Sequence, residues 1–96
     1  MKRITPAEFE EIKEKTRDAL GGKVDYSLRY HGKSGAKYAR GMMDISPRGK
    51  RDWTLEEFDM VLAWMRGAGL VLSGTANTPN YYANKSGLNY LIKSEG

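Results

Sequence analysis

Residues 23–51 read KVDYSLRYHGKSGAKYARGMMDISPRGKR, and the spacing of apolar side chains in this stretch indicates how the chain folds. In its first eight residues every second side chain is apolar or aromatic: Val24, Tyr26, Leu28 and Tyr30. The residues between them are polar or charged. This period of two is typical of a β-strand with one buried face and one solvated face. We therefore expect a strand over residues 23–30.

The residues after this strand predict that the chain turns back on itself. Residues 31–35 read HGKSG and are rich in residue types that tolerate the backbone conformations of a tight turn. Residues 36–45 are expected to return as the antiparallel partner, with Gly41 marking a bulge. Residues 46–52 contain proline and glycine, and we expect them to form the loop that leaves the hairpin.

Two helices are expected on either side of this hairpin, over residues 4–20 and 53–66. Both contain apolar residues at helical spacing. Each also begins with a threonine that is followed three residues later by a glutamate. These pairs are Thr5 with Glu8 and Thr54 with Glu57. The pattern is a capping box, in which each of the two side chains accepts a hydrogen bond from a backbone N–H at the start of the helix.

Beyond the second helix, two further strands are expected, over residues 70–72 and 88–93. The first is fully apolar, and the second is the last strand of the chain. Both are short, as most strands in small domains are. They supply the second half of the chain with the same kinds of element as the first half.

The two halves also resemble each other in sequence, which predicts an internal duplication. The pattern Lys-Ser-Gly-x-x-Tyr occurs at residues 33–38 and again at residues 85–90. The halves would be residues 1–52 and 53–96. The alternative is that capping boxes and Lys-Ser-Gly turns recur by chance. We expect a single α+β domain of two αββ halves, in the order αββαββ, that form one antiparallel sheet with two helices packed on one face.

Composition excludes several classes of protein. The chain of 96 residues has no cysteine, which rules out disulfides, thiolate zinc sites and a cysteine nucleophile. No apolar run approaches the ~18 residues of a membrane helix. The basic start, Met1 to Arg3, is not followed by the apolar segment of a signal peptide. We expect a soluble, cytoplasmic protein without a membrane partner.

The net charge of +4 is unevenly distributed along the chain. Residues 1–52 hold thirteen Lys/Arg and eight Asp/Glu, which gives +5. Residues 53–96 hold three Lys/Arg and four Asp/Glu, which gives −1. Such asymmetry favours a surface that binds a polyanion.

No pattern in the chain predicts catalysis or a metal site. Gly32-Lys33-Ser34 is similar to the end of a phosphate-binding loop, but Ser27 stands where that motif needs its first glycine. His31 is the only histidine, and no nucleophile stands at a diagnostic spacing from it. Most carboxylates lie at helix starts, where they complement the helix dipole. We expect no enzyme activity, no catalytic residue, no metal and no cofactor.

The strongest functional signal is the cationic segment, residues 29–51, with seven Lys/Arg against the single acid Asp44. Cations bind phosphates, and interleaved aromatic rings stack on unpaired bases. We therefore predict a non-enzymatic protein that binds DNA or RNA through a basic hairpin and loop. The predicted contacts are Arg29, Tyr30, His31, Lys33, Lys37, Tyr38, Arg40, Arg48, Lys50 and Arg51. Further candidates for base stacking are Tyr81, Tyr82 and Tyr90.

The second helix supports an alternative function. Leu55, Met60 and Trp64 widen its apolar surface beyond the stripe that a core requires. Exposed aromatic and methionine side chains are typical of protein interfaces. This alternative predicts a protein-binding inhibitor or adaptor, such as a phage-type accessory protein acting on a host nucleoprotein complex. The same surface is also compatible with a homodimer.

Overall fold

An antiparallel sheet and two helices make up the part of the chain that the structure describes. The structure is a computed structural model, and it describes residues 2–73 and 83–94. Its elements are α1 (Pro6–Leu20), β1 (Tyr26–His31), the 3-10 turn η1 (Lys37–Ala39), β2 (Met42–Pro47), α2 (Leu55–Gly67), β3 (Leu70–Leu72), β4 (Ala83–Asn84) and β5 (Gly87–Lys93). The α+β class expected from the sequence is confirmed. No helix among the described residues is long and apolar enough to cross a membrane.

Strand β5 is the centre of the sheet, whose order is β1-β2-β5-β3 with β4 also paired to β5. All of these pairings are antiparallel. Leu91 of β5 lies opposite Met43 of β2 and also opposite Leu72 of β3. Leu88 lies opposite Ile45 of β2 and Ala83 of β4. Strands β3 and β4 therefore occupy one edge of β5, and β2 occupies the other.

The element order departs from two equal αββ halves. In the first half a single strand, β1, lies outside β2. In the second half two short strands, β3 and β4, share the corresponding position outside β5. The two Lys-Ser-Gly segments also differ. Residues 32–41 connect β1 to β2 and contain η1, whereas residues 85–86 join β4 directly to β5. The duplication itself stays a prediction.

The second strand of the hairpin was expected over residues 36–45, but only the last part of that range forms a strand. The first part forms η1 and a turn that ends at Gly41, whose φ is +77°. The Gly41 N–H donates to the His31 carbonyl, and the Gly41 carbonyl accepts from Ile4 N–H at 2.7 Å. Strand β2 then begins at Met42 and continues to Pro47, so the exit loop starts two residues later than residue 46.

Both helices begin as the capping boxes predict. Thr5 Oγ1 accepts from Glu8 N–H, and Glu8 Oε1 accepts from Thr5 N–H at 2.9 Å. Thr54 and Glu57 make the same pair of bonds at the start of α2. A good N-cap stabilises a helix by about 1 kcal/mol. The expected starts of both helices are thus confirmed to within two residues.

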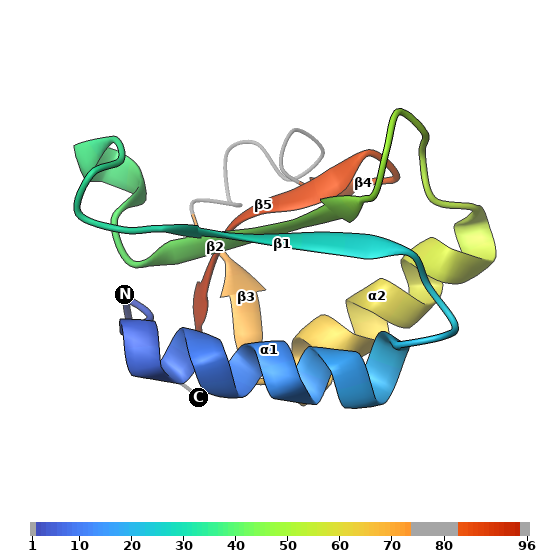
Figure 1. Ribbon diagram of the computed structural model, residues 1–96, viewed down its shortest axis with the longest axis horizontal. Helices are drawn as coiled ribbons and strands as arrows, with labels where there is room; N and C mark the ends of the chain where they lie inside the picture. Colours follow the sequence, from blue (N-terminus) through green and yellow to red (C-terminus); the bar gives the residue numbers. More distant parts are fainter. Residues whose placement is uncertain (1, 74–82, 95–96) are drawn as a thin grey trace.

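The hydrophobic core lies between the sheet and the two helices, which cover the same face of the sheet (Figure 1). Two residues of β2 and two of β5 are fully buried in this core. They are Met43, Ile45, Leu88 and Leu91. Trp53, directly before the α2 N-cap, is 1% exposed, and its Nε1 donates to the Asp25 carbonyl at 3.1 Å. This anchor ties the start of α2 to the start of β1. Of the described α-helices, both lie on this one face of the sheet.

Candidate nucleic-acid interface

The hairpin divides the cationic segment between the two ends of the sheet. Residues 32–41 lie at one end of β1 and β2, and residues 48–51 lie at the other (Figure 1). A six-residue strand is roughly 20 Å long. Charges that are adjacent in the sequence therefore form two separate groups, which we call the tip cluster and the exit loop.

The tip cluster consists of Lys33, Lys37 and Arg40, together with Arg3 from the N-terminal segment. Arg3 Nη1 donates to the carbonyls of Tyr38 and Arg40 at 3.2 and 2.6 Å, so this guanidinium is held against η1. All four side chains are exposed. Within residues 2–73 and 83–94, no carboxylate lies within ion-pair distance of these four cations. Their charge is thus available to an external anion.

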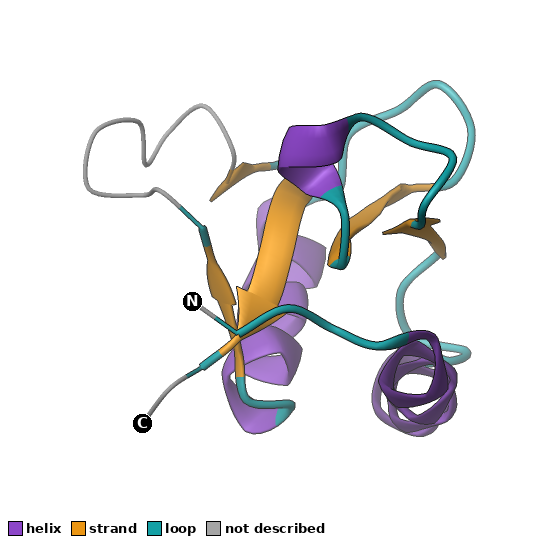
Figure 2. Cartoon of the chain, turned by 90° about the vertical axis from the view of Figure 1, so that its left-hand side faces the viewer, coloured by secondary structure: helices purple, strands orange, loops and turns teal. Residues whose placement is uncertain are grey.

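The η1 turn also carries the most exposed aromatic ring of the described chain. The Tyr38 side chain is 67% exposed, whereas Ala39 next to it is 1% exposed and anchors the turn. Figure 2 shows η1 above the sheet, while α1, seen end-on, lies below it. The exposed Tyr38 ring thus belongs to η1, next in the chain to Lys37 of the tip cluster.

The exit loop differs from the tip cluster because two of its cations are already paired. Arg51 Nη1 and Nη2 each lie 3.1 Å from a Glu57 carboxylate oxygen. The Arg51 hydrogen bonds lower the pKa of Glu57 to about 2, and the same contact raises the pKa of Arg51. Arg48 donates to the Tyr26 carbonyl at 3.0 Å and lies 3.7 Å from Asp25. Lys50 is exposed and has no partner among the described residues.

Tyr30 lies on the helix side of the sheet. Its ring stacks on Phe9 of α1 with centroids 4.9 Å apart, and its hydroxyl donates to the Ile4 carbonyl at 2.6 Å. These contacts tie β1 to the start of α1. Because the ring is covered on that face, the interface that we propose below does not use Tyr30.

The face of the sheet opposite the helices, which we call the open face, carries Arg29 and His31. They alternate with the helix-facing residues of β1. His31 Nε2 lies 2.8 Å from Asp44 Oδ2 on the neighbouring strand β2. The His31 ring also contacts the Tyr90 ring of β5, and the Tyr90 ring contacts Tyr38 edge-on, both with centroids 5.9 Å apart. His31, Tyr90 and Tyr38 thus form an aromatic row that leads to the tip cluster.

A bulge in β5 places Tyr90 in this row. One residue of β2, Asp44, lies between Met43 and Ile45, but two residues of β5, Asn89 and Tyr90, lie between their partners Leu88 and Leu91. The extra residue allows Tyr90 to take a φ of +60°, which is uncommon for a residue with a large side chain. Strained conformations of this kind concentrate at functional sites.

The residues of the alternative protein interface are distributed between surface and core. Leu55 is 66% exposed at the start of α2, but Trp64 is only 6% exposed and Met60 packs against the core. Trp64 Nε1 is buried, and the described part of the chain offers it no hydrogen-bond partner. The apolar surface of α2 is therefore mostly core, and Leu55 alone stands out on it.

The described residues contain no group of three or more His, Asp or Glu side chains that would hold a metal ion. Tyr81 and Tyr82 lie outside the described residues. Comparison of the chain with models of known protein families, with curated proteins and with solved structures finds no match.

Sequence reasoning missed Arg3 and the role of Asp44. Arg3 is 37 residues from Arg40, and the backbone hydrogen bond from Ile4 N–H to the Gly41 carbonyl holds the N-terminal segment beside it. In the sequence, Asp44 is the one acid among the cations of residues 29–51. In the structure it positions His31 and Tyr90, and no local sequence signal shows a contact that spans 46 residues.

Proposed function

We propose that the protein binds nucleic acid, without catalysing a reaction, through the tip cluster and the aromatic row. The observation that carries this proposal is the juxtaposition of unpaired cations with an exposed ring. Lys33, Lys37 and Arg40 lack carboxylate partners among the described residues, and Tyr38 between them is 67% exposed. Cations of this kind bind phosphates with release of counterions, and exposed rings stack on bases.

The arrangement favours a single strand over a duplex. Stacking on Tyr38 and Tyr90 requires bases that are not already stacked and paired in a helix. Arg29 and His31 extend the same surface along the open face toward the middle of β1. Both DNA and RNA present the phosphates and bases that this surface would recognise. The proposal places the protein in the cytoplasm, as expected for a cysteine-free chain.

In this proposal the exit loop is a secondary contact. Arg48 and Arg51 are held by Asp25 and Glu57, so phosphate binding there has to compete with existing ion pairs. Lys50 is the exit-loop cation that needs no such exchange. The tip cluster should therefore contribute most of the affinity.

The test is a salt series with labelled single- and double-stranded DNA and RNA. With about four phosphate contacts, the affinity for a single strand should fall roughly 50-fold between about 50 and 200 mM salt. A single strand should also bind more tightly than the duplex of the same sequence. Absence of binding to every oligonucleotide at low salt would contradict the proposal.

The alternative, a protein-binding inhibitor or adaptor that uses α2, is supported by the exposed side chain of Leu55 alone. It predicts a complex that resists nuclease and is weakened by Leu55→Ala. Trp64→Ala would not separate the two functions, because Trp64 belongs to the core and its truncation would destabilise the fold.

A further inference from the structure

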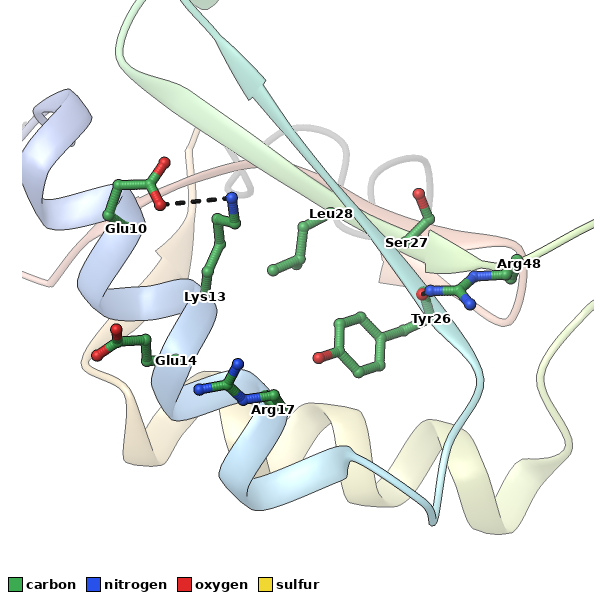
Figure 3. A pocket seen from close by; sticks show the side chains of 8 residues that line it. All are labelled: Glu10, Lys13, Glu14, Arg17, Tyr26, Ser27, Leu28 and Arg48. Atoms are coloured by element: carbon green, nitrogen blue, oxygen red, sulfur yellow. Dashed lines mark hydrogen bonds and ion pairs between the residues drawn. The ribbon is translucent and has the colours of Figure 1, made fainter.

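A groove of about 540 Å³ runs between α1 and the outer edge of β1, on a side of the molecule that the proposed nucleic-acid interface does not use (Figure 3). Tyr26 and Leu28 project from β1 into it and are half-buried. The charged side chains of α1 form its other wall. A groove with an apolar floor between a helix and a strand edge has the shape that accepts an extended chain.

The outer edge of β1 has unpaired backbone groups at defined positions. The His31 carbonyl accepts from Gly41 N–H, so the peptide groups of His31 face β2. Tyr26 lies opposite Pro47, which has no N–H, and its carbonyl accepts from the Arg48 side chain instead. Because successive residues of a strand point their backbone groups to opposite sides, those of Leu28 and Tyr30 point away from β2, toward the free edge.

This edge lacks the features that usually prevent pairing with another chain. β1 is six residues long and contains no proline, and no strand of the described chain lies outside it. Arg29 is the one arginine or lysine of β1, and its side chain points to the open face, so it does not block the backbone groups of the free edge. Exposed regular edges of this kind are templates for an added strand.

The charges around the groove indicate what kind of chain would fit. Arg17 and Arg48 lie on two sides of the Tyr26 ring in Figure 3, and Arg17 has no ion-pair partner among the described residues. Lys13 lies 3.4 Å from Glu10, so those two charges neutralise each other. Glu14 is the one remaining acid of the lining. Arg48 lies 3.7 Å from Asp25, so within the described chain Arg17 is the unpaired cation at the end of the groove near Tyr26.

We propose that the groove binds an extended, acidic peptide segment of a partner protein, which adds to the sheet as a strand beside β1. The peptide backbone pairs with the N–H and C=O groups of Leu28 and Tyr30. Its inward side chains are apolar and cover Tyr26 and Leu28. In the antiparallel orientation, which continues the pattern of this sheet, its C-terminal half carries the carboxylates that meet Arg17 and Arg48.

The test uses a short capped peptide of alternating valine and threonine with glutamates in its C-terminal half, and follows amide hydrogen exchange of the whole protein. Binding should slow exchange at Leu28 and Tyr30. Exchange at Ser27 and Arg29 should not change, because their amides already face β2. The same peptide N-methylated at the residues that pair with β1 should not bind.

Charge variants test the orientation of the peptide. Arg17→Glu should weaken binding about fivefold, and moving the glutamates to the N-terminal half should do the same. Arg48→Glu should weaken it less, because Arg48 is already paired with Asp25. Arg66→Glu is the matched control, since Arg66 is exposed in the last turn of α2 and does not line the groove. Thermal melting of each variant checks that the fold is intact.

Three outcomes would overturn the proposal. One is unchanged exchange at Leu28 and Tyr30 at saturating peptide. Another is slower exchange that depends on protein concentration without peptide, because a second copy of the chain would then occupy the edge. The third is protection of the same amides by an oligonucleotide. The tip-cluster variant Lys33→Glu/Lys37→Glu/Arg40→Glu should bind the peptide normally, which separates this groove from the proposed nucleic-acid interface.

Discussion

Asp44 Oδ1 accepts a hydrogen bond from the backbone N–H of Tyr90 at 2.8 Å, from β2 to β5 across the bulge. A bulge leaves its extra residue outside the regular ladder, so the side chain of Asp44 provides the acceptor that a backbone carbonyl would otherwise provide. The other carboxylate oxygen of Asp44 holds His31. One carboxylate thus fixes two members of the aromatic row.

Asp44→Ala should therefore destabilise the protein by about 1–3 kcal/mol, the cost of leaving a part-buried donor without its partner. Asp44→Asn should cost less, because the amide oxygen still accepts from Tyr90 N–H. Urea unfolding measures both free energies. Asp52→Ala, at an exposed residue of the exit loop, is the control and should stay within about 0.5 kcal/mol of the unsubstituted protein. Equal losses for Asp44→Ala and Asp52→Ala would rule out this role.

A substitution of Tyr90 distinguishes its effect on backbone strain from its effect on nucleic-acid binding. Asparagine tolerates a positive φ much better than tyrosine, so Tyr90→Asn relieves backbone strain while it removes the ring contacts with His31 and Tyr38. We expect the free energy of unfolding to change by less than about 1 kcal/mol, because the two effects oppose each other. Oligonucleotide affinity, measured by fluorescence anisotropy, should nevertheless fall several-fold. Unchanged affinity would exclude Tyr90 from the interface.

The sequence predicts those elements whose signals are local. The capping boxes at Thr5 and Thr54 act within one turn, and both were placed correctly from residue types alone. The alternation that begins at Val24 likewise places the strand, although β1 starts at Tyr26 and continues to His31. These features depend on neighbours only a few residues apart.

The features that could not be predicted depend on contacts between distant residues. Nothing in residues 29–51 shows that the hairpin separates Lys37 from Lys50 by the length of a strand. The alternation from Val24 does place Tyr30 on the buried face, but not its stacking on Phe9. The bulge at Tyr90 arises from the register between β2 and β5. Register is a property of the assembled sheet, and the weak alternation of the last strand leaves it undetermined in the sequence.

Gly41 is required at its position because of its positive φ and because Arg3 lies close to it. Gly49, which has only the positive φ, allows the two effects to be measured separately. Both Gly41 and Gly49 have φ near +80°. An added Cβ at Gly41 would lie 2.8 Å from Arg3 Cβ, whereas at Gly49 it meets nothing within 4 Å. Gly49→Ala should cost about 1–2 kcal/mol, the price of the left-handed conformation alone. Gly41→Ala should cost at least about 1 kcal/mol more in urea unfolding, because Arg3 has to move. Equal costs would show that the contact with Arg3 is unimportant.

Two partly exposed ion pairs predict how stability depends on pH. Hydrogen bonds from Lys93 lower the pKa of Glu8 to about 2, and those from Arg51 do the same for Glu57. Both values lie below the 4.5 of an unperturbed glutamate, so the folded state binds fewer protons than the unfolded state. The stabilisation is present above about pH 4.5 and is lost as the pH falls toward about 2.

Urea midpoints across this range should fall with pH, and less steeply in the Glu8→Gln/Glu57→Gln variant. The control is Glu11→Gln, at an exposed residue of α1, which should retain the full dependence. A double variant whose midpoints follow those of the unsubstituted protein through the whole range would show that neither pair contributes.

The division of the cationic segment gives the most direct test of the proposed interface. Lys33→Glu/Lys37→Glu/Arg40→Glu reverses three unpaired cations of the tip cluster, and Arg48→Glu/Lys50→Glu/Arg51→Glu reverses the exit loop, so the two variants have the same net charge. If charge alone decided affinity, both would lose it equally. The structure predicts a greater loss of affinity in the tip-cluster variant, because Arg48 and Arg51 are already engaged by Asp25 and Glu57.

The slope of log affinity against log salt concentration should decrease by about two in the tip-cluster variant. It should decrease by less than about one in the exit-loop variant, where Lys50 alone is unpaired. A greater loss in the exit-loop variant would move the interface to the opposite end of the hairpin.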